Sequence, residues 1–282
     1  MIELNNLSYR YHSGITALTD VTTRIEPGIH LLLGENGAGK TTMLHLIAGL
    51  LRPTHGTLDI DGQAPALRMP DTLSRLFLYT DNMILPCKNI NEFVTAHAKF
   101  YPTFSQEVLD DCLKEFGMTG MEPLNAMSFG NRRKAQLAYV IALGTEVLML
   151  DEPANGLDIT AKQALRRLIA RHISSDRTVI ISTHTVSDLE TLFDSLMVIH
   201  AGRLIASQPV WSIVERLNFM SAMMPPEEFI YCEQEQGLFR YITAACGNDQ
   251  HDTDINYQLL YNALLSPKAS EIISILNKKD ND

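Results

Sequence analysis

The feature that most constrains the fold is a glycine-rich octapeptide, Gly34-Glu-Asn-Gly-Ala-Gly-Lys40-Thr41, which fits the pattern G-x-x-x-x-G-K-[ST]. A short apolar run, residues 29–33, precedes it, and apolar residues at helical spacing follow over residues 40–50. In such a loop, backbone N–H groups converge on phosphate oxygens, and the following helix points its positive end at them. The order strand, glycine-rich turn, helix predicts an α/β core with a buried parallel strand.

Two side chains of this loop are expected to contact a nucleotide. Lys40 would bind the β- and γ-phosphates, and the hydroxyl of Thr41 would hold Mg²⁺. The alternative is a chance glycine-rich turn, which arises in roughly one chain per hundred of this length. The strand before the loop and the helix after it favour the phosphate-binding interpretation.

A second candidate site element is an apolar run that ends in two carboxylates. Residues 147–150 are all apolar, and Asp151 and Glu152 follow them. A buried strand would carry Asp151 to the carboxyl edge of the sheet beside the loop, where it would order the Mg²⁺ shell. Glu152 would face the γ-phosphate and polarise the attacking water. This pattern is weak alone and strong beside a phosphate loop.

The chain is expected to divide into an α/β core with an insertion and a C-terminal extension. Helical spacing over residues 89–144 predicts a helical subdomain, about residues 85–144, inserted into a core that spans residues 1–217. Residues 218–282 form an accessory segment, whose removal should leave ATP binding intact. Strands are expected at 2–11, 17–25, 29–33, 57–60, 76–79, 147–150, 178–181, 196–200, 202–206, 228–233 and 238–244, and further helices at 161–173, 257–265 and 269–276.

Composition excludes several classes of protein. Lys and Arg total 23 against 33 Asp and Glu, and this net charge of −10 argues against a nucleic-acid-binding protein. No apolar run approaches the roughly 20 residues that a membrane-spanning helix needs, and no secretory signal is expected from the first residues, which include an early Glu and no apolar stretch. The four cysteines form no CxxC pair, so reduced thiols are expected. Residues 248–254 are expected to form a solvated turn, with cation binding as the alternative.

The chain resembles the nucleotide-binding subunit of an ATP-binding cassette (ABC) transporter, and the resemblance runs from Met1 to about Leu217. GENGAGKTT is similar to the Walker A loop, LMLDEP to the Walker B strand, and Asn155-Gly156-Leu157-Asp158 to the D-loop. Ser182-Thr183-His184 follows an apolar run as the switch histidine of the family does. The resemblance implies catalytic roles for Lys40, Glu152 and His184. The implied ATP contacts are Tyr11, Gly34, Glu35, Asn36, Gly37, Ala38, Gly39, Lys40, Thr41 and Thr42.

The lesser motifs have structural alternatives. Tyr11 is expected to stack on adenine, but an aromatic residue in a strand can simply pack on a neighbour. His184 could lie at the start of a helix over residues 186–193. Asp158 could cap the helix that follows it, with or without a D-loop role.

Two motifs depart from the family pattern. The signature, usually LSGGQ, here is Met127-Ser128-Phe129-Gly130-Asn131, and Ser128, Gly130 and Asn131 would bind ATP held by the opposite subunit. The next residues, 132–134, are all basic and are expected to form a solvated helix face, with contact to phosphate or to a partner as the alternative. Asp81 stands at the position of the Q-loop glutamine and would be a third metal ligand with Thr41 and Asp151. Asn82 is the other candidate at that position.

The resemblance implies a cytoplasmic ATPase of α/β phosphate-loop type, with an antiparallel β subdomain, that uses ATP and Mg²⁺. It would drive a separately encoded membrane permease, of an exporter type, and lie peripherally at the inner face of the membrane. Two such subunits, identical or homologous, would enclose ATP between them. One alternative is a single-cassette ATPase with soluble partners, as in iron–sulfur assembly. Another is a cassette that binds ATP without hydrolysis, which the presence of Glu152 and His184 disfavours.

Overall fold

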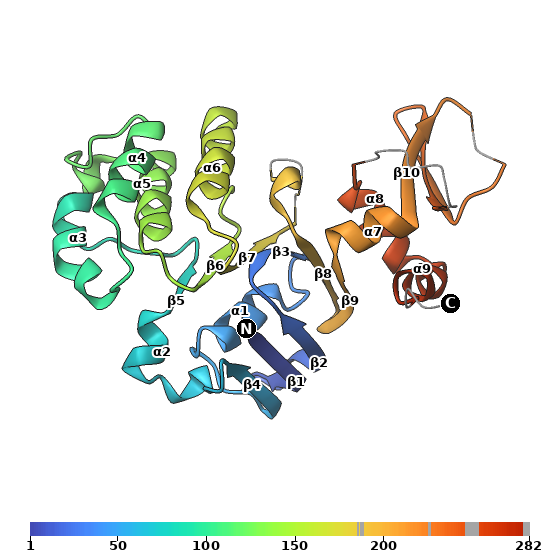
Figure 1. The fold of residues 1–282 in the computed structure, drawn as a ribbon, viewed down its shortest axis with the longest axis horizontal. Coiled ribbons are helices and arrows are strands. Elements are labelled where there is room, and N and C mark those ends of the chain that lie inside the picture. Colours follow the sequence, from blue (N-terminus) through green and yellow to red (C-terminus); the bar gives the residue numbers. More distant parts are fainter. Residues whose placement is uncertain (185, 187–188, 225–226, 246–253, 279–282) are drawn as a thin grey trace.

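A six-stranded sheet lies at the centre of the molecule (Figure 1). The computed structural model describes residues 1–184, 186, 189–224, 227–245 and 254–278. The strand order is β5-β6-β7-β3-β8-β9, in which β9 alone runs antiparallel to its neighbour. The bounds are β3 Gly28–Leu33, β5 Leu76–Tyr79, β6 Val147–Asp151, β7 Thr178–Thr183, β8 Ser195–His200 and β9 Arg203–Pro209.

The central strands read as unbroken apolar runs because both faces of the sheet are covered. In β3, Leu31 and Leu33 point into one hydrophobic core and Leu32 points into another. Adjacent strands repeat this alternation, with Leu148 and Met149 of β6 on opposite faces. Two-sided burial is the normal environment of parallel strands and explains the missing polar alternation.

The second core lies between the central sheet and a three-stranded antiparallel sheet with the order β2-β1-β4. These strands are β1 Ile2–Arg10, β2 Thr16–Ile25 and β4 His55–Ile60. Helix α1, Lys40–Ile47, contributes Met43 and Leu44 to this core. The helix is shorter than expected from residues 40–50. The predicted antiparallel subdomain is present.

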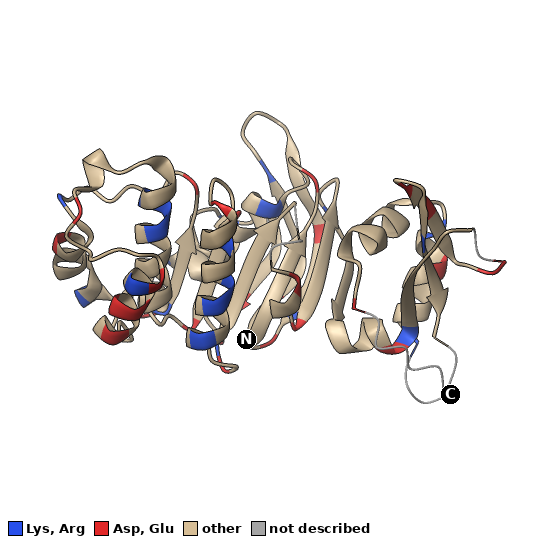
Figure 2. Cartoon of the chain, turned by 90° about the horizontal axis from the view of Figure 1, so that it is seen from above, with Lys and Arg blue, Asp and Glu red and all other residues tan. Residues whose placement is uncertain are grey.

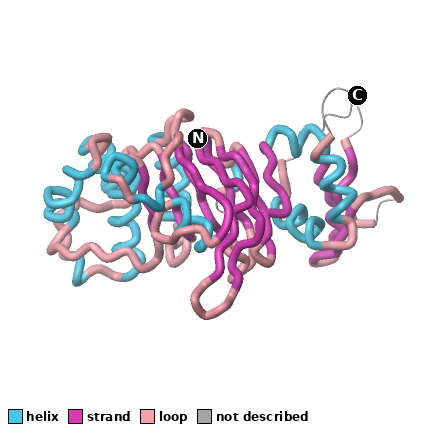
Figure 3. The backbone as a smooth tube through the Cα atoms, turned by 90° about the horizontal axis from the view of Figure 1, so that it is seen from below, coloured by secondary structure: helices cyan, strands magenta, loops and turns pink. Residues whose placement is uncertain are grey.

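Helices gather at one end of the molecule (Figure 3). The short α2, Pro70–Ser74, precedes β5, and the subdomain itself contains α3 Ile90–His97, α4 Gln106–Glu115 and α5 Phe129–Ala142. Helix α6, Ile159–His172, lies against α4 and α5. Basic residues recur along α6 (Figure 2), and two of them, Arg167 and Arg171, bind Glu115 and Asp111 of α4 at 2.7 and 2.8 Å.

The C-terminal segment occupies the opposite end and has its own sheet, with the order β10-β12-β11 (Figure 1). Helix α7, Val210–Arg216, leads from the core into this segment, whose elements are β10 Leu217–Ala222, β11 Tyr231–Glu235, β12 Leu238–Ala244, α8 Tyr257–Leu265 and α9 Ala269–Leu276. The predicted hairpin and both predicted helices are confirmed. Strand β10 was not predicted, and it makes the sheet three-stranded.

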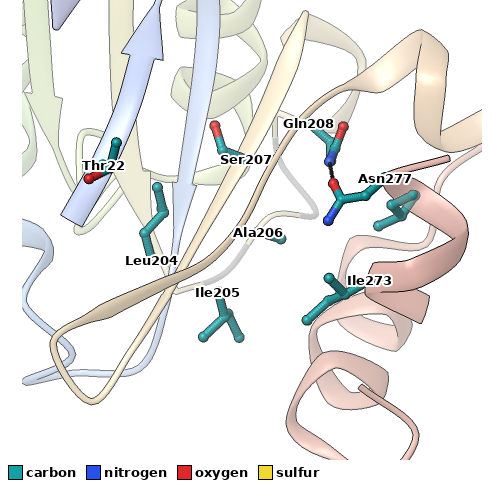
Figure 4. Close-up of a pocket in the computed structure, with 9 residues that line it drawn as sticks. Thr22, Leu204, Ile205, Ala206, Ser207, Gln208, Ile273 and Asn277 are labelled. Atoms are coloured by element: carbon teal, nitrogen blue, oxygen red, sulfur yellow. Dashed lines mark hydrogen bonds between the residues drawn. The ribbon is translucent and has the colours of Figure 1, made fainter. Parts of the chain in front are cut away.

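Helix α9 lies beside the edge strand β9 of the central sheet, and the two line a pocket (Figure 4). The Nε2 atom of Gln208 donates to Oδ1 of Asn277 at 2.8 Å, and Ile273 faces Ile205 beside it. Arg216 Nη1 donates to the carbonyl of Leu276 at 2.6 Å. The C-terminal segment is therefore joined to the core by polar bonds at the end of α9, and the exposed edge of the sheet is partly covered.

Short 3₁₀ turns complete the chain at Pro65–Leu67, Ala98–Phe100, Leu124–Ala126 and Glu190–Leu192. The last of these turns falls within residues 186–193, where a helix was considered. Residues 187 and 188 of that range lie outside the described part of the chain. Residues 248–253 of the expected solvated turn also lie outside it. Within the described ranges, no helix has the length and apolar character needed to cross a membrane.

Candidate functional site

Three of the predicted motifs begin at the carboxyl ends of neighbouring strands. Strand β7 pairs with β3 on one side and with β6 on the other. The loop at Gly34 follows β3, Glu152 follows β6, and His184 follows β7. Ligands of open α/β sheets bind at this edge. The topology thus gathers candidate residues that lie far apart in the sequence.

The glycines of the loop after β3 are required by its backbone path. Gly37 and Gly39 have φ values of 82° and 113°, which residues with a side chain rarely adopt. At Gly34 the restriction is space, because a Cβ atom would lie 2.4 Å from the carbonyl oxygen of Ile199. The loop leads directly into α1, so its backbone N–H groups and the positive end of that helix face the same region.

Lys40 is buried at the base of this loop, with 6% of its surface exposed. Its Nζ atom donates to the carbonyls of Gly34 at 2.7 Å and Glu35 at 3.1 Å, and it lies 3.9 Å from Oε1 of Glu152. Burial lowers the pKa of Lys40, and the charges of Glu152 and Asp151 oppose that shift. An ammonium group held this way is suited to exchange carbonyl partners for phosphate oxygens.

Asp151, at the end of β6, accepts hydrogen bonds from two hydroxyl groups. Thr41 Oγ1 donates to Asp151 Oδ2 at 2.8 Å, and Ser182 Oγ donates to Oδ1. Mg²⁺ prefers oxygen ligands and is commonly held by one or two carboxylates together with substrate phosphates. The hydroxyl of Thr41 and the carboxylate of Asp151 therefore fit a magnesium ion. Ser182 was not assigned a role from the sequence, although it belongs to the Ser-Thr-His motif.

Glu152 has a strained backbone that turns its side chain toward β7. Its φ is 49°, and its N–H donates to the carbonyl of Ser182 at 3.0 Å. Its Oε1 atom lies 2.8 Å from Nδ1 of His184. The structure thus brings together Lys40, Asp151, Glu152 and His184, as the motifs predicted. This backbone conformation is uncommon for a residue with a side chain.

Tyr11 lies beside the start of α1 and is 38% exposed. Its hydroxyl forms a 2.9 Å hydrogen bond with Oγ1 of Thr42, and its ring packs edge-on against Tyr9 with centroids 4.9 Å apart. The packing alternative is therefore present in the structure. Stacking on adenine stays a prediction, which the exposed ring surface allows.

The signature residues begin α5. The side chain of Ser128 caps the helix by accepting a 3.3 Å bond from Asn131 N–H, as expected, and Phe129 is 59% exposed. Ser128, Phe129 and Asn131 are all exposed, so the N-terminal end of α5 is open to solvent. Contact of Ser128, Gly130 and Asn131 with ATP of a second subunit stays a prediction.

The expected solvated face at residues 132–134 is wrong for Arg133. This side chain is 3% exposed and pairs with Oδ1 of Asp81 at 2.5 Å. It also donates to the carbonyl of Asn155 and lies over the Phe129 ring, 4.6 Å from its centroid. The Q-loop, signature and D-loop positions therefore meet at one guanidinium. Asp81 is occupied by this ion pair, and its role as a metal ligand stays a prediction.

Asp158 caps α6, as its structural alternative predicted. It accepts a 2.8 Å bond from the Ala161 N–H, and Lys134 Nζ lies 3.4 Å from its other oxygen. The Ala161 N–H lowers the pKa of Asp158, and Lys134 adds to that shift. This cap fixes where the D-loop ends and α6 begins.

Comparison with known proteins gives one consistent family. Residues 18–155 match the family described as ABC transporter. The ABC transporter ATP-binding protein NatA of Bacillus subtilis (strain 168) is 30% identical over 226 residues, covering 76% of this chain and 92% of that protein. The aliphatic sulfonates import ATP-binding protein SsuB 1 of Rhodococcus jostii (strain RHA1) is 31% identical over 202 residues, covering 70% and 78%.

Solved structures agree. The structure of an ATP-binding subunit of an ABC transporter has a TM-score of 0.68 and 25% identity, and the match covers 76% of this chain and 91% of that one. The α/β fold with its antiparallel subdomain is thus the fold of ABC ATPases. The chain belongs to the ATP-binding subunits of ABC transporters, a family of enzymes that hydrolyse ATP.

Proposed function

We propose that this chain binds Mg-ATP at the ends of β3, β6 and β7 and powers a separately encoded membrane permease. The observation that carries the proposal is the convergence of Lys40, Asp151, Glu152 and His184. They come from three motifs that are far apart in the sequence, and Glu152 lies within 3.9 Å of Lys40 and 2.8 Å of His184. A buried lysine beside a carboxylate and an imidazole provides groups suited to phosphoryl transfer to water.

Each residue has a defined task in this mechanism. The loop amides and Lys40 bind the β- and γ-phosphates, while Thr41 and Asp151 would hold Mg²⁺, which neutralises charge on the phosphates when bound. Glu152 orients a water molecule toward the γ-phosphorus and accepts its proton as the bond to the β–γ bridging oxygen breaks. ADP carries away the electron pair of that bond. His184 fixes the Glu152 carboxylate through the hydrogen bond between them.

The second half of each ATP site comes from another subunit. Support comes from the outward position of the α5 N-terminus, where Phe129 is exposed and Ser128 presents a capped helix end. Such an end attracts a γ-phosphate. Ser128, Gly130 and Asn131 would thus complete the site of the opposite subunit, in a homodimer or a heterodimer.

The direction of transport is proposed as export, on the form of the signature and the presence of the C-terminal segment. One relative carries import in its name, so the family itself contains the opposite direction. Soluble partners, as in iron–sulfur assembly, are not favoured because the similar proteins are transporter subunits. Association with a permease would hold the chain at the cytoplasmic face of the membrane.

The experiment is affinity purification of the tagged full chain from detergent-solubilised membranes. We expect one membrane protein with several spanning helices to co-purify, and ATP hydrolysis to increase in the complex. Recovery of soluble scaffold proteins in place of a membrane protein would reject the transport function. ATPase activity of the chain tests the site separately from the partner.

A further inference from the structure

Helix α8 lies outside the ATPase motifs and carries two tyrosines, of which one contacts the phosphate loop and the other contacts the chain beyond His184. Tyr257 and Tyr261 lie four residues apart and therefore share one face of the helix. The Tyr261 hydroxyl accepts a 3.2 Å bond from the N–H of Glu35 in the phosphate loop. The Tyr257 hydroxyl donates to the Glu190 carbonyl at 3.4 Å, beyond the switch histidine. One helix of the C-terminal segment thus reaches both sides of the site.

The contact with the phosphate loop falls on a peptide group that also holds the catalytic lysine. The Gly34 carbonyl accepts from Lys40 Nζ at 2.7 Å, and the N–H of the same peptide belongs to Glu35 and donates to Tyr261. In a trans peptide these two groups point in opposite directions. The peptide therefore connects Lys40 on one side with Tyr261 on the other, and hydrogen bonds in such a chain strengthen one another.

Tyr261 is held rigidly enough to position that peptide. Its side chain is 7% exposed, and α8 buries Leu260 and Leu264 in the main core. The Asn256 side chain caps the helix by accepting a 2.9 Å bond from Leu259 N–H. Burial raises the pKa of Tyr261, so its hydroxyl stays neutral at physiological pH. The oxygen is a fixed acceptor.

The other end of the helix is braced in the same way. The Tyr257 ring packs edge-on against Phe193, with centroids 5.9 Å apart, and its hydroxyl reaches Glu190. The first turn of α8 also borders a cavity of about 590 Å³ that His184 lines. The helix thus spans from the phosphate loop to the segment that follows His184.

We propose that Tyr261 is a positioning residue for ATP hydrolysis, through which the C-terminal segment sets the orientation of the Gly34–Glu35 peptide and of Lys40. The proposal rests on the role assigned to Lys40 under the proposed function. It argues against the expectation that residues after 217 can be removed without effect on ATP binding. Without Tyr261 the peptide is free to rotate, and Lys40 loses a fixed starting position.

Tyr261→Phe removes only the hydroxyl and keeps the buried ring. We expect the KM for ATP to rise about three- to tenfold, the effect of one lost hydrogen bond, with a smaller change in kcat. Tyr231→Phe is the matched control, because it removes another hydroxyl of the C-terminal segment, bonded to Glu233 at 3.2 Å. This control should behave as the wild type.

Two further measurements distinguish positioning from a purely structural role. Amide hydrogen exchange, measured in the full chain without nucleotide, should be faster at Glu35 in Tyr261→Phe and unchanged in Tyr231→Phe. In a double-mutant cycle for ATP binding, Tyr261→Phe should add little once Lys40 is replaced by Met, because the two act through one peptide. A structural role would instead give additive losses.

The outcomes separate this inference from the assigned site. If Tyr261→Phe matches the wild type in KM and in Glu35 exchange while Lys40→Met binds ATP much more weakly, the positioning role is wrong and the site stands. If Lys40→Met binds and hydrolyses ATP normally, the site itself is wrong. A Tyr261→Phe variant with a strongly lowered Tm and unchanged Glu35 exchange would likewise overturn the positioning role.

Discussion

The Nδ1 atom of His184 lies 2.8 Å from Oε1 of Glu152, so a residue after β7 fixes the carboxylate that follows β6. The Glu152 side chain is 16% exposed and that of His184 is 42% exposed. The carboxylate is thus held from the protein side while one face of the imidazole is open to solvent. This geometry suits a carboxylate that orients water.

Replacing Glu152 with Gln should lower ATP hydrolysis about 100-fold or more, because the shape is kept and the proton acceptor is lost. An amide can still bond to His184, so ATP should bind normally. Without turnover, the ATP-bound pair of subunits should accumulate, visible as a shift toward dimer by light scattering on addition of Mg-ATP.

ADP is the control in that experiment, since it lacks the γ-phosphate that Ser128 would grip. If the isolated chain stays monomeric, the measurement is repeated with the permease bound. Hydrolysis at the wild-type rate in Glu152→Gln would show that Glu152 is not the base.

Replacing Lys40 with Met should abolish hydrolysis without destabilising the nucleotide-free protein. Burial lowers the pKa of Lys40 in the folded state, so the ammonium carries a free-energy cost there that the unfolded chain does not have. The cost is present below the folded-state pKa and disappears as pH rises toward the ordinary value of 10.5. We expect a Tm at or above that of the wild type at pH 7.5, and a smaller difference near pH 10. A lower Tm at pH 7.5 would show that the bonds from Lys40 to the loop carbonyls outweigh its burial.

Tyr11 variants separate the ring from the hydroxyl. Tyr11→Ala should raise the KM for ATP several-fold, since aromatic stacking contributes about 1 kcal/mol. Tyr11→Phe keeps the ring and loses the bond to Thr42, so a smaller increase is expected. Steady-state ATPase kinetics decide between them. Equal increases would assign the effect to the Thr42 bond and remove the case for stacking.

The parts of the site that are formed by residues contiguous in the sequence could be predicted. The glycines between Gly34 and Thr41 indicate the backbone path of the loop, and the strand before Asp151 is a clear apolar run. The apolar run predicts a strand over residues 178–181, whereas β7 continues through the polar residues Ser182 and Thr183. They are nevertheless buried, and Ser182 binds Asp151, a partner from another strand.

The remaining contacts depend on distant parts of the chain. The bond between Glu35 and Tyr261 joins residues 226 positions apart, and no local pattern marks it. Arg133 looks like one of three solvated basic residues until the Q-loop and D-loop close over it. Strand β10 was not predicted for the same reason. It pairs with β12 and not with β11, the strand that follows it in the chain.

The Asp81–Arg133 pair predicts a measurable coupling. Arg133 is buried, so Asp81→Ala removes the carboxylate that compensates its charge. We expect the unfolding free energy to fall by about 1–3 kcal/mol. This loss is smaller than for a fully buried pair because Asp81 is half exposed. Arg133→Met removes the charge, and Asp81→Ala should then cost little in the double variant. Urea unfolding of the four proteins gives the coupling, and additive losses would show that the pair contributes nothing.

Phe129 stands where the family signature has a glycine. It predicts that a substitution at Phe129 can partly suppress the effect of a substitution at Gly156. Gly156 in the D-loop has a φ of 72°, and a Cβ atom there would lie 2.6 Å from Cε1 of Phe129. Gly156→Ala should therefore displace the Phe129 ring, and with it Arg133, which lies over that ring. We expect a loss of about 1–3 kcal/mol in unfolding free energy from the backbone conformation and the contact together, and reduced ATPase activity.

Adding Phe129→Ala to Gly156→Ala removes the collision but not the backbone strain. Part of the lost stability should return, and ATPase activity should rise above that of Gly156→Ala alone. Phe129→Ala by itself is the control, and its own loss must be subtracted in the cycle. If the second substitution restores nothing, the two residues do not interact as the structure shows, and the D-loop glycine is needed only for its backbone angle.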